Sequence, residues 1–99
     1  YNRISSRRRF GRIAQLLGEL TQGISADEAS RKAITAINIL SKDVGIPDGL
    51  IALGKKYGKE VREADIPTMT ANAQKDACGL TNPRSMTDAA VAAIYKAAL

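Results

Sequence analysis

The stretch Ser25–Gly45, SADEASRKAITAINILSKDVG, carries the strongest structural signal in the chain. Ser25 followed three residues later by Glu28 forms a capping box, in which each side chain satisfies an unpaired amide of the first helical turn. Apolar residues then recur on one face at helical spacing, and Gly45 supplies a stop; that face consists of Ala29, Ala33, Ala36 or Ile37, Leu40 and Val44. The stretch therefore predicts an α-helix that buries one side.

Four more helices are expected around this one, because capping residues and glycines punctuate the remaining chain. The first is expected from Ser5 or Ser6 to Gly18. The second follows a turn at Ile46-Pro47-Asp48, runs through Leu50, Ile51 and Leu53 and closes at Gly54. The last two are expected from Asp65 to Gly79, with Pro67 in the first turn, and from Thr87 with Asp88 to the end. Residues 55–60 are a polar loop or an extra turn. The expected fold class is all-α, with about five short helices in a small bundle around one small core.

Composition agrees with this fold class. The 99 residues suit one modest domain, and alanine occurs sixteen times against an aromatic share of 4%, which favours closely packed helices over a β-sandwich. No apolar run approaches the roughly 20 residues of a membrane span, and no signal peptide opens the chain. We therefore expect a soluble, cytoplasmic protein.

The absence of histidine limits the chemistry that these residues can perform. No Ser-His-Asp triad, Cys-His pair or histidine-ligated metal site is available within the chain. The single cysteine, Cys78, excludes an internal disulfide and fits a reducing compartment. Cys78 precedes Gly79 at an expected helix end, where the helix dipole raises the pKa of a thiol. We therefore interpret Cys78 as a small apolar residue in the wall of a site and not as a nucleophile.

Other polar groups have structural explanations as well. Asn72 and Asp76 lie four residues apart and form a plausible hydrogen-bonded pair. Glu63 is interpreted as a surface residue and Asp65 as a helix cap. The glycines at 45, 49, 54 and 58 form no phosphate-binding loop. Taken by themselves, the residues indicate a helical interaction domain or a part of something larger.

The net charge of +5 comes from one short segment. Five arginines precede the first acid, Glu19, and the rest of the chain is neutral; they are Arg3, Arg7, Arg8, Arg9 and Arg12. The alternative function is therefore a stand-alone helical binding module that uses this basic segment on an acidic partner or nucleic acid. A solvated or partner-facing helix side explains the charge more simply, since no stacking aromatic array or zinc ligand accompanies it.

Several motifs resemble the C-terminal region of the iron-containing (group III) alcohol dehydrogenases. They are Asp43–Pro47 with the later Leu53-Gly54, the DIP element of Asp65–Pro67, the KDAC element of Lys75–Cys78, the TNPR element of Thr81–Arg84, and the closing helix Ala92–Leu99. The resemblance spans nearly the whole chain in collinear order. One departure from the family is the segment Gly54–Val61, which is longer than the usual linkage between the Leu-Gly and Asp-Ile-Pro elements.

The resemblance implies a parent enzyme of two domains. Its reaction is hydride transfer between a primary alcohol or diol and NAD or NADP, with a divalent metal, usually iron and sometimes zinc, as Lewis acid. One aspartate and three histidines of such enzymes hold the metal, and none can be carried over here, so no metal, cofactor-binding or catalytic residue is assigned. Only Cys78 maps onto a family role, as a wall of the substrate pocket.

The resemblance also sets the expected organisation. Residues 1–99 are expected to be a single helical piece, the C-terminal fragment of a longer chain; the lean apolar content and the missing initiator methionine favour the same view. We expect the piece alone to be inactive. Its partners are expected to be the remainder of the dehydrogenase chain and a small alcohol, in a homo-oligomeric parent, with no membrane and no nucleic acid.

Overall fold

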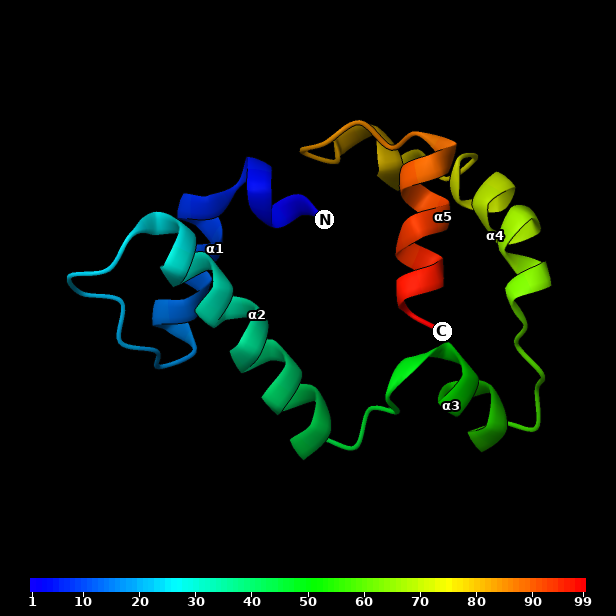
Figure 1. Cartoon of the computed structure of the whole chain (residues 1–99), viewed down its shortest axis with the longest axis horizontal. Coiled ribbons are helices and arrows are strands. Elements are labelled where there is room, and N and C mark those ends of the chain that lie inside the picture. Colours follow the sequence, from blue (N-terminus) through cyan, green and yellow to red (C-terminus); the bar gives the residue numbers. More distant parts are fainter. The chain divides into compact units, whose positions relative to one another are not determined.

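The computed structural model describes all 99 residues, and they form helices without any β-strand (Figure 1). The α-helices are α1 (Arg7–Leu16), α2 (Ala26–Asp43), α3 (Gly49–Lys56), α4 (Ile66–Ala73) and α5 (Asp88–Ala97); short 3₁₀-helices are η1 (Asn2–Ser5), η2 (Glu63–Asp65) and η3 (Ala77–Thr81). The expected all-α class with five helices is confirmed. The chain divides into two compact units, Tyr1–Ile46 and Pro47–Leu99.

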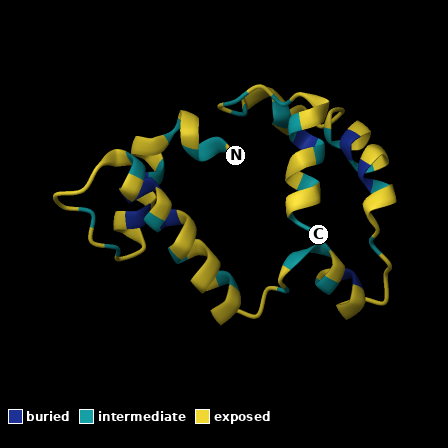
Figure 2. Cartoon of the chain, viewed as in Figure 1, coloured by how far each residue is buried: buried dark blue, intermediate teal, exposed yellow.

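The first unit is built on the packing of α1 against α2. Ala14, Ala29 and Ala33 are buried there, together with Ser30. Figure 2 shows buried positions in both helices. The predicted capping box of α2 is confirmed: the Ser25 hydroxyl accepts the Glu28 amide at 3.2 Å, and the Glu28 carboxylate accepts the Ser25 amide at 2.9 Å. Further along α2, Leu40 and Val44 are exposed, so only the first half of the predicted apolar face is covered within the unit.

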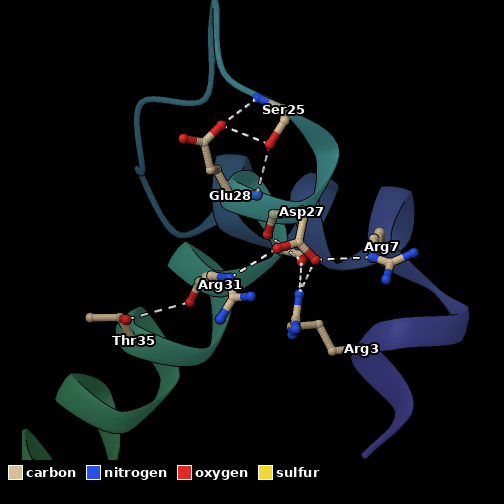
Figure 3. Close-up of polar contacts among 8 residues, drawn as sticks. Arg3, Arg7, Ser25, Asp27, Glu28, Arg31 and Thr35 are labelled. Carbon is tan, nitrogen blue, oxygen red and sulfur yellow. Dashed lines mark hydrogen bonds and ion pairs between the residues drawn. The ribbon is translucent and has the colours of Figure 1, made fainter.

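A carboxylate near the start of α2 links three elements of the first unit. Asp27 accepts hydrogen bonds from Arg3 at 2.6 Å, Arg7 at 3.0 Å and Arg31 at 2.9 Å, and these arginines come from η1, α1 and α2 (Figure 3). The bonds from Arg3, then Arg31 and Arg7, hold the pKa of Asp27 far below its ordinary value. One negative charge thereby connects three elements.

The second unit pairs α4 with α5. Ile66 and Thr70 of α4 and Val91 of α5 are buried, and the Gln74 amide donates to the Met86 carbonyl at 2.6 Å and to Asp88 at 2.7 Å. Thr87 caps α5 as predicted, accepting the Ala90 amide. The buried apolar residues thus fall into two groups, one in each unit, where the sequence predicts one small core.

The chain end caps α3. Asp48 makes no side-chain bond to the helix; instead the amides of Leu50 and Ile51 donate to the carbonyls of Ala98 at 2.7 Å and Leu99 at 3.4 Å. These contacts satisfy amides that the helix itself leaves unpaired. The C-terminal residues are therefore part of the fold of the second unit.

Two predicted helix ends are wrong. Gly54 does not close α3, because the helix continues to Lys56. The glycine that follows the helix end is Gly58, with a φ of +65°. Gly54 is buried inside α3, where a Cβ would lie 2.6 Å from the Lys59 carbonyl oxygen. The next helix ends at Ala73 and does not reach Gly79, since Asp76 is extended and its carboxylate binds the Cys78 amide instead.

None of the five α-helices combines the length and the hydrophobicity that crossing a lipid bilayer requires.

We predict that Gly49→Ala destabilises the second unit more than Gly58→Ala does. Both glycines have positive φ, so alanine introduces comparable backbone strain. A Cβ at Gly49 would also lie 2.9 Å from the Leu99 carbonyl oxygen, whereas nothing lies within 4 Å of one at Gly58. Urea unfolding should show an additional loss of about 1–3 kcal/mol for Gly49→Ala; equal losses would mean that the chain end does not restrict α3.

Asp27→Asn should lower the melting temperature at neutral pH. The difference in melting temperature between this variant and the unsubstituted protein should become smaller as the pH falls below about 4. The folded protein keeps Asp27 ionised to lower pH than the unfolded chain does, so this stabilisation is present above the unfolded pKa and is lost on acidification. Melting curves across pH check this. Asp43→Asn, on the same helix but outside every ion pair of the structure, is the control; an equal and pH-independent effect of both changes would contradict the prediction.

Candidate functional site

A hollow of about 300 Å³ lies in the second unit beside Cys78. Its wall combines the end of α4, the η3 segment, the loop that follows and α5; the residues are Ala73, Asp76, Cys78, Gly79, Asn82, Met86 and Tyr95. Four of them are aliphatic, sulfur-containing or glycine, so most of the wall is apolar. The sequence singled out Cys78, and the structure places it in a concave surface.

Local hydrogen bonds shape this wall. The Asp76 carboxylate caps η3 by accepting the Cys78 amide at 2.8 Å. Asn82 donates from its side chain to the Arg84 carbonyl at 2.6 Å. The side-chain amide of Gln74 donates a hydrogen bond to the Met86 carbonyl. The loop therefore has a defined course around the hollow.

Cys78 is exposed, and its surroundings disfavour ionisation of its thiol. A hydrogen bond to the Asp76 carboxylate, followed by the negative charge of that group, raises the pKa of Cys78. The direction agrees with the sequence prediction, but the cause is different: Cys78 lies at the start of a 3₁₀-helix, and the neighbouring acid replaces the expected helix dipole. A neutral thiol is a weak nucleophile, and this hollow contains no lysine or histidine to act as its base.

Asp76 is the member of the site whose contact the sequence misassigned. The spacing predicted a pair with Asn72, whereas the carboxylate bonds to Cys78, and these bonds, the backbone amide first, hold the pKa of Asp76 below its ordinary value. An aspartate that accepts the amide two residues ahead is an Asx-turn, so Asp76-Ala77-Cys78 carried the relevant signal. Met86 and Tyr95 join the hollow through tertiary folding alone.

The acidic residues near α4 do not form a second site. Glu63 pairs with Lys96 at 2.7 Å and Asp65 pairs with Arg62 at 3.3 Å. Their carboxylates are thus used in surface ion pairs, and they do not converge on each other.

The residues of this chain do not form a metal site. A divalent iron or zinc centre needs several imidazole, carboxylate or thiolate ligands that converge, and no three such residues lie together in the structure. Asp76 and Cys78 are adjacent but lack a third ligand.

The arginine-rich segment surrounds a second, shallow hollow of about 400 Å³ that includes Arg7, Arg8 and Arg12. Part of its charge has internal partners: Arg7 binds Asp27, and Arg12 donates to Gln15 at 3.0 Å. No aromatic side chain lines this hollow, so it lacks the stacking platform typical of single-stranded nucleic-acid sites. Arg3 and Arg7 of this segment connect η1 and α1 to α2 through Asp27.

Comparison with known proteins identifies the family. Residues 1–99 match the model of the Fe-containing alcohol dehydrogenase family, C-terminal. The chain is 43% identical over 98 residues to 1,3-propanediol dehydrogenase of Klebsiella pneumoniae and 39% identical over 99 residues to NAD-dependent methanol dehydrogenase of Bacillus methanolicus. These alignments cover 99% and 100% of this chain but 24% of each relative.

A solved structure of a 1,3-propanediol oxidoreductase superposes with a TM-score of 0.90 at 41% identity, covering 100% of this chain and 24% of that one. The chain thus spans about a quarter of the length of the relatives that it matches. Both the sequence and the fold follow their C-terminal helical part, as the DIP, KDAC and TNPR elements indicated. The chain therefore belongs to the Fe-containing alcohol dehydrogenase family, of which it represents the C-terminal region.

Proposed function

We propose that these residues are the C-terminal part of an NAD(P)-dependent alcohol dehydrogenase that transfers a hydride between a primary alcohol or diol and the nicotinamide ring. The observation that carries the proposal is the hollow beside Cys78, where the KDAC and TNPR elements meet. Relatives named for 1,3-propanediol and methanol make short primary alcohols and diols the substrates to test first.

The exposed apolar surface of the first unit supports a longer protein. Ile39 and Leu40, in the second half of α2, and Val44, which directly follows its last residue, are 49–64% exposed. A contiguous apolar surface is typical of a contact with other protein. We propose that the remainder of the dehydrogenase chain covers it, that this remainder carries the metal ligands and the nucleotide site, and that the enzyme is a homo-oligomer.

In the proposed enzyme, Cys78 is a wall of the substrate pocket and neither a nucleophile nor a metal ligand. Its neutral thiol, together with Met86 and Ala73, offers an apolar contact for the carbon chain of an alcohol. The aldehyde or alcohol oxygen would be bound by groups outside these residues. A free cysteine and no other thiol also fits the proposed cytoplasmic location.

We predict that the full-length protein, loaded with iron or zinc, reduces NAD or NADP in the presence of 1,3-propanediol. The 99-residue chain under the same conditions should give no reduced cofactor, because it lacks a ligand set for the metal. Absorbance of the reduced nicotinamide measures both. Metal-dependent turnover by the short chain, free of other proteins, would contradict the proposal.

Cys78→Ala in the full-length enzyme should change KM or the preference among alcohols while leaving most of kcat and the metal content unchanged. Loss of one small contact is worth on the order of 1 kcal/mol or less, which is at most about fivefold in apparent affinity. Steady-state kinetics with methanol, propanol and 1,3-propanediol test this.

Cys78→Ser is the matched variant, since it keeps the size of the side chain and changes its polarity. Loss of hydride transfer in both variants, with metal and cofactor still bound, would show that Cys78 has a direct chemical role and is not simply part of the wall.

A further inference from the structure

The hollow of about 400 Å³ in the first unit lies between α1, the loop after it and the start of α2. Three arginines of α1 line it, Arg7, Arg8 and Arg12, together with Gln15 of the same helix and Thr21 of the loop. No aspartate or glutamate belongs to its wall. The arginine hollow, defined by these residues, therefore carries three positive charges and no negative one.

The acids of the first unit are engaged elsewhere. The unit contains four acids against eight arginines and lysines. Asp27 already accepts hydrogen bonds from three arginine side chains. Glu19 pairs with Lys32 at 3.2 Å, and Glu28 is used in the capping box of α2. Asp43 is the last residue of α2, whose first turn borders the hollow, so the positive charge there is not balanced from within the unit.

Two of the three guanidinium groups are fixed in place. Arg12 donates to the side-chain oxygen of Gln15 at 3.0 Å, and the Gln15 amide donates to the Thr21 hydroxyl at 2.8 Å. Gln15 and Thr21 are neutral, so they orient Arg12 without removing its charge. Arg7 is fixed through its Nε by Asp27 at 3.0 Å (Figure 3). The hollow therefore contains arginines that the fold orients in advance of any ligand.

Arg8 takes part in no ion pair of the structure. A concave surface that carries charges of one sign concentrates the field and attracts ligands of the opposite sign. Arg8 and Arg12 thus supply two guanidinium groups that are not neutralised by any carboxylate of the chain. The ligand that complements this hollow is an anion.

Phosphate suits these donors better than a single carboxylate does. A guanidinium presents its N–H groups as a planar fork that matches two oxygens of a phosphate. A phosphate monoester has three acceptor oxygens and close to two negative charges at neutral pH, so more than one arginine can engage it. The rest of the wall includes Ile24, Ala26 and Ala29, which offer an apolar contact to the organic part of an ester.

We propose that the arginine hollow binds the phosphate group of a small phosphorylated molecule. Arg8 and Arg12 engage the phosphate oxygens, and Gln15 is the positioning residue that orients Arg12. The hollow belongs to the first unit, whereas the hollow beside Cys78 belongs to the second. The inference therefore does not depend on the proposed alcohol dehydrogenase reaction.

Arg8→Gln and Arg9→Gln form a matched pair of variants. Each removes one positive charge from α1, and neither arginine belongs to an ion pair. Arg8 lines the hollow and Arg9 does not. Both side chains are exposed, so we expect both variants to fold, and circular dichroism checks this. A difference between them reports the hollow and not the overall charge.

The experiment titrates the full-length protein with phenyl phosphate in a calorimeter at low ionic strength. Arg8→Gln should weaken the binding at least about tenfold, since it removes hydrogen bonds between charged groups. Arg9→Gln should weaken it less than about twofold, because its charge is separated from the hollow and screened. Phenyl phosphate bound at any other site of the protein contributes equally to both variants and cancels in the comparison.

Two further variants test the geometry of the hollow. Gln15→Leu leaves the net charge unchanged but frees Arg12 from its hydrogen bond, and it should weaken the binding several-fold. Arg8→Lys keeps the charge and loses the planar fork, and it should also weaken the binding. Full affinity in both variants would mean that general attraction to positive charge explains the binding, and it would overturn the proposed site.

The choice of phosphate has its own control. Benzoate carries a similar ring and a carboxylate in place of the phosphate, and it should bind more weakly than phenyl phosphate and respond little to Arg8→Gln. Equal binding of the two probes would overturn the preference for phosphate. Equal affinities of Arg8→Gln and Arg9→Gln for phenyl phosphate would refute the site, whatever the outcome of the alcohol oxidation assay.

Discussion

Ala29 lies so close to α1 that a Cβ added to Gly11 would be 3.2 Å from its methyl group. This close approach of two helices depends on small side chains, and it explains why alanines at 14, 29 and 33 are the buried apolar residues of the first unit. Each alanine buries little apolar area. Polar contacts therefore supplement the packing, above all the three arginines that bind Asp27.

That arrangement changes the meaning of the positive charge. From the sequence, the five arginines before Glu19 are interpreted as a solvated or partner-facing helix side, with a binding face as the alternative. In the folded unit, Arg3 and Arg7 converge with Arg31 on one carboxylate (Figure 3). A charged segment of this kind connects helices, since a carboxylate with several guanidinium partners joins elements that are distant in sequence.

In the second unit a carboxylate again determines the local structure, with a different chemical result. Asp76 ends the helical course that periodicity predicts up to Gly79 and creates the turn that presents Cys78. Its charge then opposes ionisation of the thiol. Membership of the Fe-containing alcohol dehydrogenase family gives this hollow a context, and no three potential metal ligands lie together in the structure.

The helical class, the capping box of Ser25 and Glu28, the start of the last helix at Thr87 and the family all followed from the sequence alone, because they depend on spacing within a few residues or on collinear motifs. The same motifs singled out Cys78 as a wall of the substrate pocket, a role that stays a prediction. Only the folded chain could show that Gly54 stays inside α3, where the Lys59 carbonyl approaches it, and that Met86 and Tyr95 join Cys78 around one hollow. The capping of α3 by the carbonyls of Ala98 and Leu99 is a further tertiary result. Such contacts join residues far apart in the chain, and local propensity carries no information about which distant carbonyl, ring or carboxylate will occupy the neighbouring space.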